Sequence, residues 1–121
     1  MKTNEYKILV LSDLKEESKK ALNYAAKLAK EINAKVELLH IKTISKIAQM
    51  ENPIAISREI SEVQNKMNKQ INDFIQPVSE ENNIKIETTF SLGNIKNVIE
   101  KHIKTINPDM IILGERTPKK F

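Results

Sequence analysis

Cysteine is absent from the 121-residue chain, which excludes disulfides, thiolate zinc sites and cysteine nucleophiles. The chain has only two glycines, Gly93 and Gly114. A dinucleotide-binding fingerprint or a Walker-type phosphate loop needs several glycines in one turn, so neither motif is present. Aromatic residues make up 4% of the chain, which argues against base stacking on aromatic side chains and predicts an aliphatic core.

The sequence has no long run of residues with the same charge. The net charge is +4, and the lysines are interspersed with glutamates, so we expect no nucleic-acid partner. The only two histidines, His40 and His102, have no cluster of metal-ligating residues near them in sequence, so we expect no metal site. No catalytic residue is recognisable; enzymatic activity is left undecided, with a non-enzymatic role favoured.

Long hydrophobic runs are also missing. The first apolar run, at residues 8–11, is shorter than the apolar region of a signal peptide and far shorter than a membrane span. We therefore expect a cytoplasmic protein with no membrane partner. The length fits a single domain over residues 1–121.

Apolar patterning predicts four strands. Continuous apolar runs are typical of buried parallel strands, and strict alternation indicates a strand with one solvated face, near an edge of the sheet. The first pattern occurs at residues 8–11 and 110–113, a mostly apolar segment lies at 36–41, and the second pattern occurs at 84–90.

Three helices are predicted between these strands. They carry apolar residues at helical spacing at 22–32, 60–74 and 95–106. The first should end at Asn33, the second at or shortly after Pro77, and the third should be capped by Asn94. Residues 42–57 show no period and contain Pro53. We interpret them as a long surface connection, with a lid over a binding site as the alternative.

The element order is therefore β-α-β-α-β-α-β, which predicts an α/β fold: a Rossmann-like, parallel open sheet with helices on both faces. Ligands of such sheets bind at the carboxyl ends of the strands. Asp13 follows the first strand, where its carboxylate could hydrogen-bond a ribose or base, or else cap the first helix. For His40, a half-buried ring with satisfied hydrogen bonds is favoured over a ligand role.

Five segments together resemble the universal stress protein family. They are residues 7–14, 18–25, 34–41, 92–95 and 108–114, and they occur in the family's order. The resemblance implies a parallel five-stranded sheet. The four strands present here would have the order 3-2-1-4, and the last helix and fifth strand would be missing from the chain. It also implies frequent dimerisation and a division into nucleotide-binding and non-binding members.

The resemblance also implies a site. Asp13 and Ile41 match the residues that contact the nucleoside in binding members, and Gly114 matches the glycine that opens their phosphate loop. The sequence then departs from the family, because Thr117 stands where a second glycine is found and Pro118 follows it. That departure argues against carrying phosphate binding over to this chain.

These features predict a cytoplasmic stress-response protein that acts through association, with at most weak nucleotide binding. The alternative is a member that binds ATP or another adenine nucleotide and slowly hydrolyses ATP, with a phosphate loop completed by residues absent here. A third reading is a structural or regulatory domain without a ligand. The apolar strand at 110–113 would be an unpaired edge. We therefore expect either a homodimer through this strand or a chain cut short of its natural end.

Overall fold

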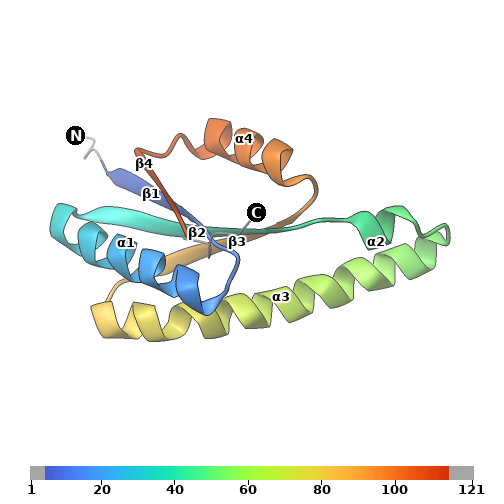
Figure 1. Cartoon of the computed structure of the whole chain (residues 1–121), viewed down its shortest axis with the longest axis horizontal. Coiled ribbons are helices and arrows are strands. Elements are labelled where there is room, and N and C mark those ends of the chain that lie inside the picture. The colour runs from blue at the N-terminus through green and yellow to red at the C-terminus, as the bar shows by residue number, and fades with distance from the viewer. Residues whose placement is uncertain (1–4, 115–121) are drawn as a thin grey trace, which may run out of the picture.

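In a computed structural model of the chain, residues 5–114 are described, without the side chains of Ser45 and Lys46. They form a four-stranded parallel sheet flanked by helices (Figure 1). The elements are β1 (Tyr6–Leu11), a 3-10 turn (Glu16–Ser18), α1 (Lys19–Ile32), β2 (Ala34–Lys42), α2 (Ser45–Ala48), α3 (Pro53–Asn82), β3 (Ile86–Leu92), α4 (Ile95–Ile106) and β4 (Met110–Leu113). The strand order is β3-β2-β1-β4, which confirms the predicted α/β fold and sheet order.

The helices form layers on both faces of the sheet. α1 and α3 cover one face, and α4 covers the other (Figure 1). This follows from right-handed crossovers: the chain moves outward from β1 to β3 and then returns past β1 to β4, so its last helix lies on the opposite face. None of the described helices is both long and apolar enough to cross a bilayer.

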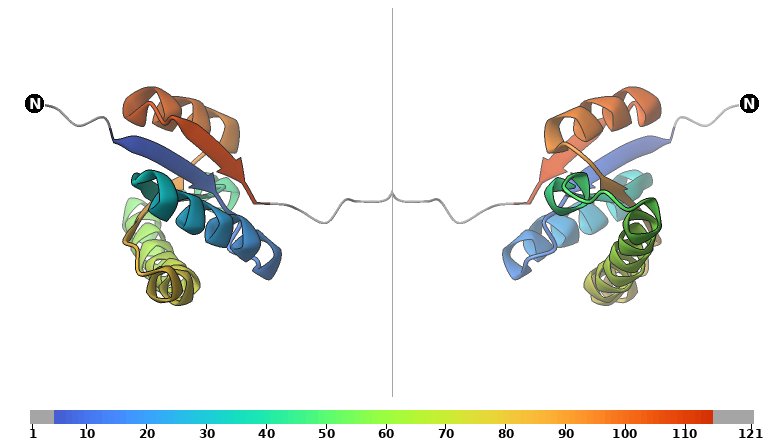
Figure 2. Two further views of the ribbon diagram at one scale, coloured as in Figure 1. Left: turned by 90° about the vertical axis from the view of Figure 1, so that its left-hand side faces the viewer. Right: turned by 90° about the vertical axis from the view of Figure 1, so that its right-hand side faces the viewer.

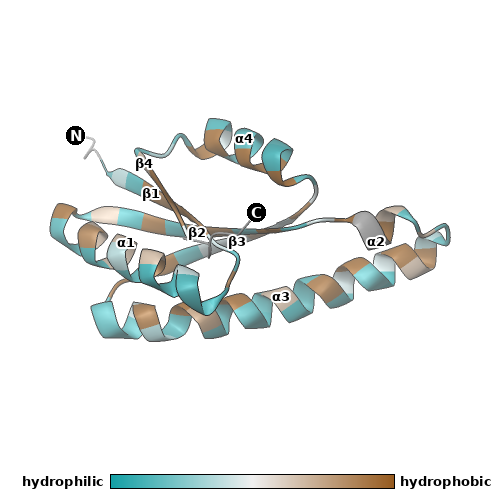
Figure 3. Cartoon of the chain, viewed as in Figure 1, coloured by the Kyte–Doolittle hydropathy of each residue, from teal (hydrophilic) through white to brown (hydrophobic). Residues whose placement is uncertain are grey.

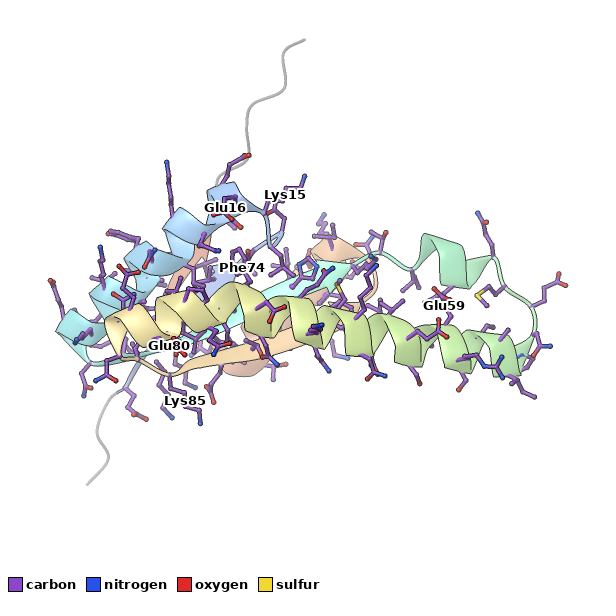
Figure 4. The ribbon with its side chains drawn as sticks, turned by 90° about the horizontal axis from the view of Figure 1, so that it is seen from below. Lys15, Glu16, Glu59, Phe74, Glu80 and Lys85 are labelled. Carbon is purple, nitrogen blue, oxygen red and sulfur yellow. The ribbon has the colours of Figure 1, made fainter. Side chains whose placement is uncertain are left out.

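The main core lies between the sheet and α1 with α3. Its strand side consists of aliphatic residues that are at most 6% exposed: Ile8, Val10, Val36, Leu38 and Ile86. Three alanines of α1 allow that helix to lie close to them. Phe74 of α3 completes the core near α1 (Figure 4), and the Lys19 ammonium lies 5.4 Å from its ring centroid. As predicted, α1 ends at Asn33 with a left-handed backbone (φ 57°).

The interpretation of residues 42–57 as a long connection was wrong. The segment contains α2 and the beginning of α3, a helix of 30 residues. The Asn52 side chain accepts hydrogen bonds from the backbone N–H groups of Ile54 and Ala55. Pro53 occupies the first turn, where a missing N–H costs nothing. The proline that appeared to interrupt the chain therefore belongs to a helix start.

Pro77 itself does not end α3, which was predicted to end there or shortly after it. The helix continues to Asn82 and stops at Asn83, whose backbone is left-handed (φ 50°). A proline inside a helix removes one backbone hydrogen bond and crowds the preceding turn. Here Pro77 is exposed, while Val78 and Asn82 in the following turn are buried. Packing of that turn offsets the local cost.

β3 lies at the edge of the sheet, as its alternation predicts, but it begins two residues later than expected, at Ile86. Ile84 lies outside the strand and is hydrogen-bonded to the last turn of α3 instead. Its N–H donates to the Ser79 carbonyl, and its carbonyl accepts from the Ser79 hydroxyl. These bonds compete with strand pairing at that position.

A polar cluster attaches α4 to the sheet. No residue of α4 is fully buried, so apolar packing alone holds it weakly. His102 Nε2 lies 2.9 Å from Glu37 Oε2 of β2, and the Thr89 hydroxyl of β3 donates to the same oxygen at 2.5 Å. The side chains of His102 and Glu37 are only 16% and 19% exposed. Sequence gave no signal for this cluster, because its members are far apart along the chain.

We predict that His102→Ala lowers the free energy of unfolding by about 1–3 kcal/mol, because Glu37 then loses a partner in a poorly solvated position. Urea denaturation followed by circular dichroism measures the change. Lys104→Ala, at an exposed position of the same helix, is the control and should stay within about 0.5 kcal/mol of the unmodified protein. Equal stabilities of the two variants would contradict the anchoring role.

Candidate functional site

A cavity of about 390 Å³ opens at the carboxyl edge of the sheet. It lies where the winding reverses, because β1 has β2 on one side and β4 on the other. Its lining comes from the ends of these three strands and from α4: Leu11, Ser12, Asp13, Leu39, His40, Ile41, Ile95, Ile99, Leu113 and Gly114. Most of this lining is aliphatic, and a few polar groups are concentrated at the turn after β1.

The structure brings all three predicted site residues to this one cavity. Asp13 lies in the turn after β1, Ile41 near the end of β2 and Gly114 directly after β4. They are up to 101 positions apart in sequence (114 − 13), and only the parallel register of the three strands makes them neighbours. Their proximity agrees with the predicted site, and their role in binding stays a prediction.

Asp13 does not cap the first helix. Its Oδ1 accepts a hydrogen bond of 3.0 Å from the backbone N–H of Lys15, which forms a local turn. Neither the 3-10 turn nor α1 has a side-chain cap. The capping interpretation was therefore wrong. The carboxylate is half-buried and lies on the cavity wall.

A network of two serines shapes the turn that carries Asp13. The Ser18 hydroxyl donates to the Lys15 carbonyl, so the Ser12 hydroxyl, 2.9 Å away, donates to Ser18. Ser12 in turn accepts from the N–H of Leu14 at 3.0 Å. Leu14 has a left-handed backbone (φ 64°), a costly conformation for a bulky residue. The turn, at which Figure 4 labels Lys15 and Glu16, is thus held in a strained shape by one buried and two half-buried hydrogen bonds.

Gly114 is required for packing, independently of any ligand. Its N–H donates to the Leu11 carbonyl at 3.0 Å. A Cβ at this position would lie 2.5 Å from Ser18 Cβ, closer than real Cβ atoms approach, and 3.3 Å from Ser18 Cα, a tight contact. The end of β4 therefore packs directly against the serine network, and the glycine is explained without phosphate binding.

His40 has the satisfied ring that was predicted. Its Nδ1 lies 2.8 Å from the Ser12 carbonyl oxygen, which can only accept, so Nδ1 carries the hydrogen. The ring stacks on Phe90 with centroids 6.0 Å apart. Both contacts orient the end of β2 relative to the turn after β1, so His40 positions the cavity wall.

The cavity offers little to a highly charged ligand. Asp13 is its only charged lining residue among residues 5–114, and neither lysine nor arginine lines it there. The same part of the chain contains no group of three histidine, aspartate or glutamate side chains that could hold a metal ion. The arrangement can accept an uncharged, partly apolar group and offer it one carboxylate.

Comparisons with known proteins point to one family. The model of the universal stress protein family matches residues 6–120. A search of curated protein sequences finds no match. The fold is similar to that of the universal stress protein UspA from Lactobacillus plantarum, with a TM-score of 0.73, 20% identity and coverage of 99% of this chain and 86% of that one.

Two further structures share the fold. A universal stress protein family member from Burkholderia pseudomallei has a TM-score of 0.66 and 15% identity, with coverage of 90% of this chain and 80% of that one. A universal stress protein in complex with cAMP has a TM-score of 0.58 and 13% identity, with coverage of 90% and 72%. At these identities the similarity concerns the fold.

We predict that Gly114→Ala lowers stability by about 1–3 kcal/mol, because the added methyl group overlaps Ser18. The measurement is a double-mutant cycle by urea denaturation with Ser18→Gly, which removes the opposing Cβ. The two changes should be clearly non-additive, since each alters the same contact. Additive effects would show that Gly114 is needed for another reason.

Proposed function

Because this chain belongs to the universal stress protein family, we propose that it is a cytoplasmic stress-response protein that acts through association and weakly binds an adenine nucleoside or nucleotide. One observation carries the binding part: Asp13, Ile41 and Gly114, from three different strand ends, line a single cavity. Its volume of about 390 Å³ falls in the range of small-molecule sites.

The chemistry of the lining fits the base and sugar of a nucleoside. Leu39, Ile41, Ile95 and Ile99 offer aliphatic surface to a base. The Asp13 carboxylate is an acceptor suited to a ribose hydroxyl or an exocyclic amine. A pocket with apolar walls and few polar groups is the usual design of a site that orients a small ligand.

The charges that line the cavity predict that a polyphosphate such as ATP binds weakly. ATP brings several negative charges, and the described lining of the cavity contains no lysine or arginine to attract them. A nucleoside or a cyclic nucleotide brings little or no negative charge. The complex of a similarly folded protein with cAMP makes a cyclic nucleotide a natural first ligand to test.

The alternative function is binding of ATP or another adenine nucleotide, with slow hydrolysis of ATP. Gly114 favours it, because it directly follows β4 at the cavity wall, where a phosphate loop would begin. Residues 115–121 lie outside the described part of the chain, so Thr117 and Pro118 have no structural account here. Phosphate contacts from residues after Gly114 would be needed.

The proposal predicts a dissociation constant of about 0.1 mM or weaker, near −5.5 kcal/mol, for adenosine or cAMP, with ATP and magnesium no tighter. Isothermal titration calorimetry measures all three. Asp13→Ala should weaken adenosine or cAMP binding about fivefold or more, because it removes the only carboxylate in the described lining of the cavity. Asp73→Ala, at an exposed position of α3, is the matched control and should bind like the unmodified protein.

Other outcomes select the other candidates. Micromolar ATP binding that Asp13→Ala abolishes, with slow release of phosphate, would replace the proposal by the alternative. No heat with any of the three ligands would remove the binding part and leave association as the role. Binding unaffected by Asp13→Ala would place the ligand elsewhere.

A further inference from the structure

A second pocket, of about 220 Å³, lies at the opposite, amino edge of the sheet. It opens beside the C-terminal end of α4, on the edge that faces the viewer in the left view of Figure 2, where α4 lies above the sheet and α1 and α3 lie below it. Its lining comes from the starts of three strands and the last residue of α4: Lys7, Ile8, Lys35, Glu37, Glu87 and Ile106. The pocket is thus separate from the candidate nucleoside site at the carboxyl ends of the strands.

Four charged side chains of this lining form two rows on the α4 side of the sheet. The adjacent residues of these strands point into the core with α1 and α3, so by alternation the charged ones point to the other side. The strand registers pair Lys7 with Lys35 and Glu37 with Glu87. A row of two lysines therefore lies about 7 Å along the sheet from a row of two glutamates. In Figure 3 the start of β1 is hydrophilic and the remainder hydrophobic.

Each row places like charges on neighbouring strands. Such strands are about 4.8 Å apart, and like charges directly opposite each other destabilise a sheet. Among residues 5–114, neither lysine forms an ion pair with either glutamate, and Glu87 has no side-chain partner. Local conflicts of this kind are expected at functional sites. A ligand that carries both charges would relieve the repulsion in both rows.

Glu37 is held in place as an acceptor for a cationic group. His102 Nε2 and the Thr89 hydroxyl both bind its Oε2. Its Oε1 therefore has no partner within the described part of the chain. The side chain is only 19% exposed, and an electrostatic interaction is stronger where less water screens it. An oriented carboxylate with one available oxygen thus belongs to the pocket wall.

The lysines offer donors to an anionic group. The backbone N–H of Lys7 donates at 2.8 Å to the carboxylate of Asp109, which is turned inward toward β1. The Lys7 ammonium donates to the Ile106 carbonyl at 3.3 Å, which leaves two of its three hydrogens for another acceptor. Lys35 is 58% exposed and pairs with Glu5, which is 50% exposed. A surface ion pair of this kind contributes little, so Lys35 can turn to a ligand.

We propose that the amino-edge pocket binds a small zwitterion, a free amino acid with an aliphatic side chain. Its carboxylate lies between Lys7 and Lys35, and its ammonium group lies at Glu37 and Glu87. Ile106, which is half-buried in the pocket wall, contacts the aliphatic part. An anion alone or a cation alone would neutralise one row and be repelled by the other. Sites for drug-sized ligands have about 300–1,000 Å³, so this smaller pocket suits a molecule of amino-acid size.

NMR titration of the 15N-labelled, unmodified protein with L-valine tests the proposal. Valinamide lacks the carboxylate and isovalerate lacks the amine, so each of these matched compounds keeps one charge. L-valine should shift the amide signals of Lys35, Glu37 and Glu87 with a dissociation constant of about 1–10 mM, and each single-charge compound should bind about fivefold more weakly or worse. Ionic strength is held constant, because salt screens exposed charges.

Two substitutions test the two ends of the ligand separately. Lys35→Met should weaken L-valine binding about threefold or more and reduce its advantage over valinamide. Glu87→Gln should weaken it similarly and reduce its advantage over isovalerate. Lys69→Met and Glu51→Gln, at exposed positions in α3 and just before it, are the matched controls and should bind L-valine like the unmodified protein.

Three results would overturn the proposal. The first is no shift of these amides up to about 50 mM L-valine. The second is equal binding of L-valine, valinamide and isovalerate, because one charge would then be enough. The third is a set of shifts confined to the residues around Asp13 and Gly114, which would place the amino acid in the carboxyl-edge cavity. None of these results affects the proposed nucleoside binding, which is measured with other ligands at the other edge of the sheet.

Discussion

The structure depends on the double pairing of β1. It is hydrogen-bonded to β2 on one side and to β4 on the other, in parallel on both, and Leu9 and Val10 at its centre are completely buried. Each neighbour's register against β1 determines which residues meet at the carboxyl edge. The cavity exists because three strand ends, contributing Asp13, Ile41 and Gly114, finish at the same level.

The two faces of this sheet are stabilised differently. The face covered by α1 and α3 is a continuous aliphatic core in which α1 alanines permit close packing. On the other face, α4 has no fully buried residue and is attached by the hydrogen bonds of His102 and Thr89 to Glu37. Because α4 also provides Ile95 and Ile99 to the cavity, the polar cluster and the cavity share one structural support. The less tightly packed face is therefore the one with a candidate site.

The turn after β1 is shaped by close packing and also forms part of the wall of the candidate site. The serine network holds Leu14 in a strained backbone and requires a glycine at position 114. Gly114 could therefore be explained either by packing against Ser18 or by the start of a phosphate loop. The structure supports the packing explanation directly. Whether this chain binds phosphate depends on the residues that follow Gly114.

Local signals in the sequence determined the parallel α/β fold and most helix ends, whereas the strand order was implied by the resemblance to the family. Apolar runs mark buried strands, and Asn33 and Asn94 end or begin helices through short-range hydrogen bonds, so these features need no distant partner. Local signals were misleading at the two prolines of α3. Pro53 lies in the first turn of the helix, where it does not interrupt it, and at Pro77 the packing of Val78 outweighs the tendency of proline to end a helix. The pairing of Glu37 with His102, the contact of Gly114 with Ser18 and the inward orientation of Asp109 were decided only by the tertiary structure. These contacts join residues that are far apart in the sequence and come together only on folding. The periodicity of apolar residues along the chain carries no information about such long-range contacts.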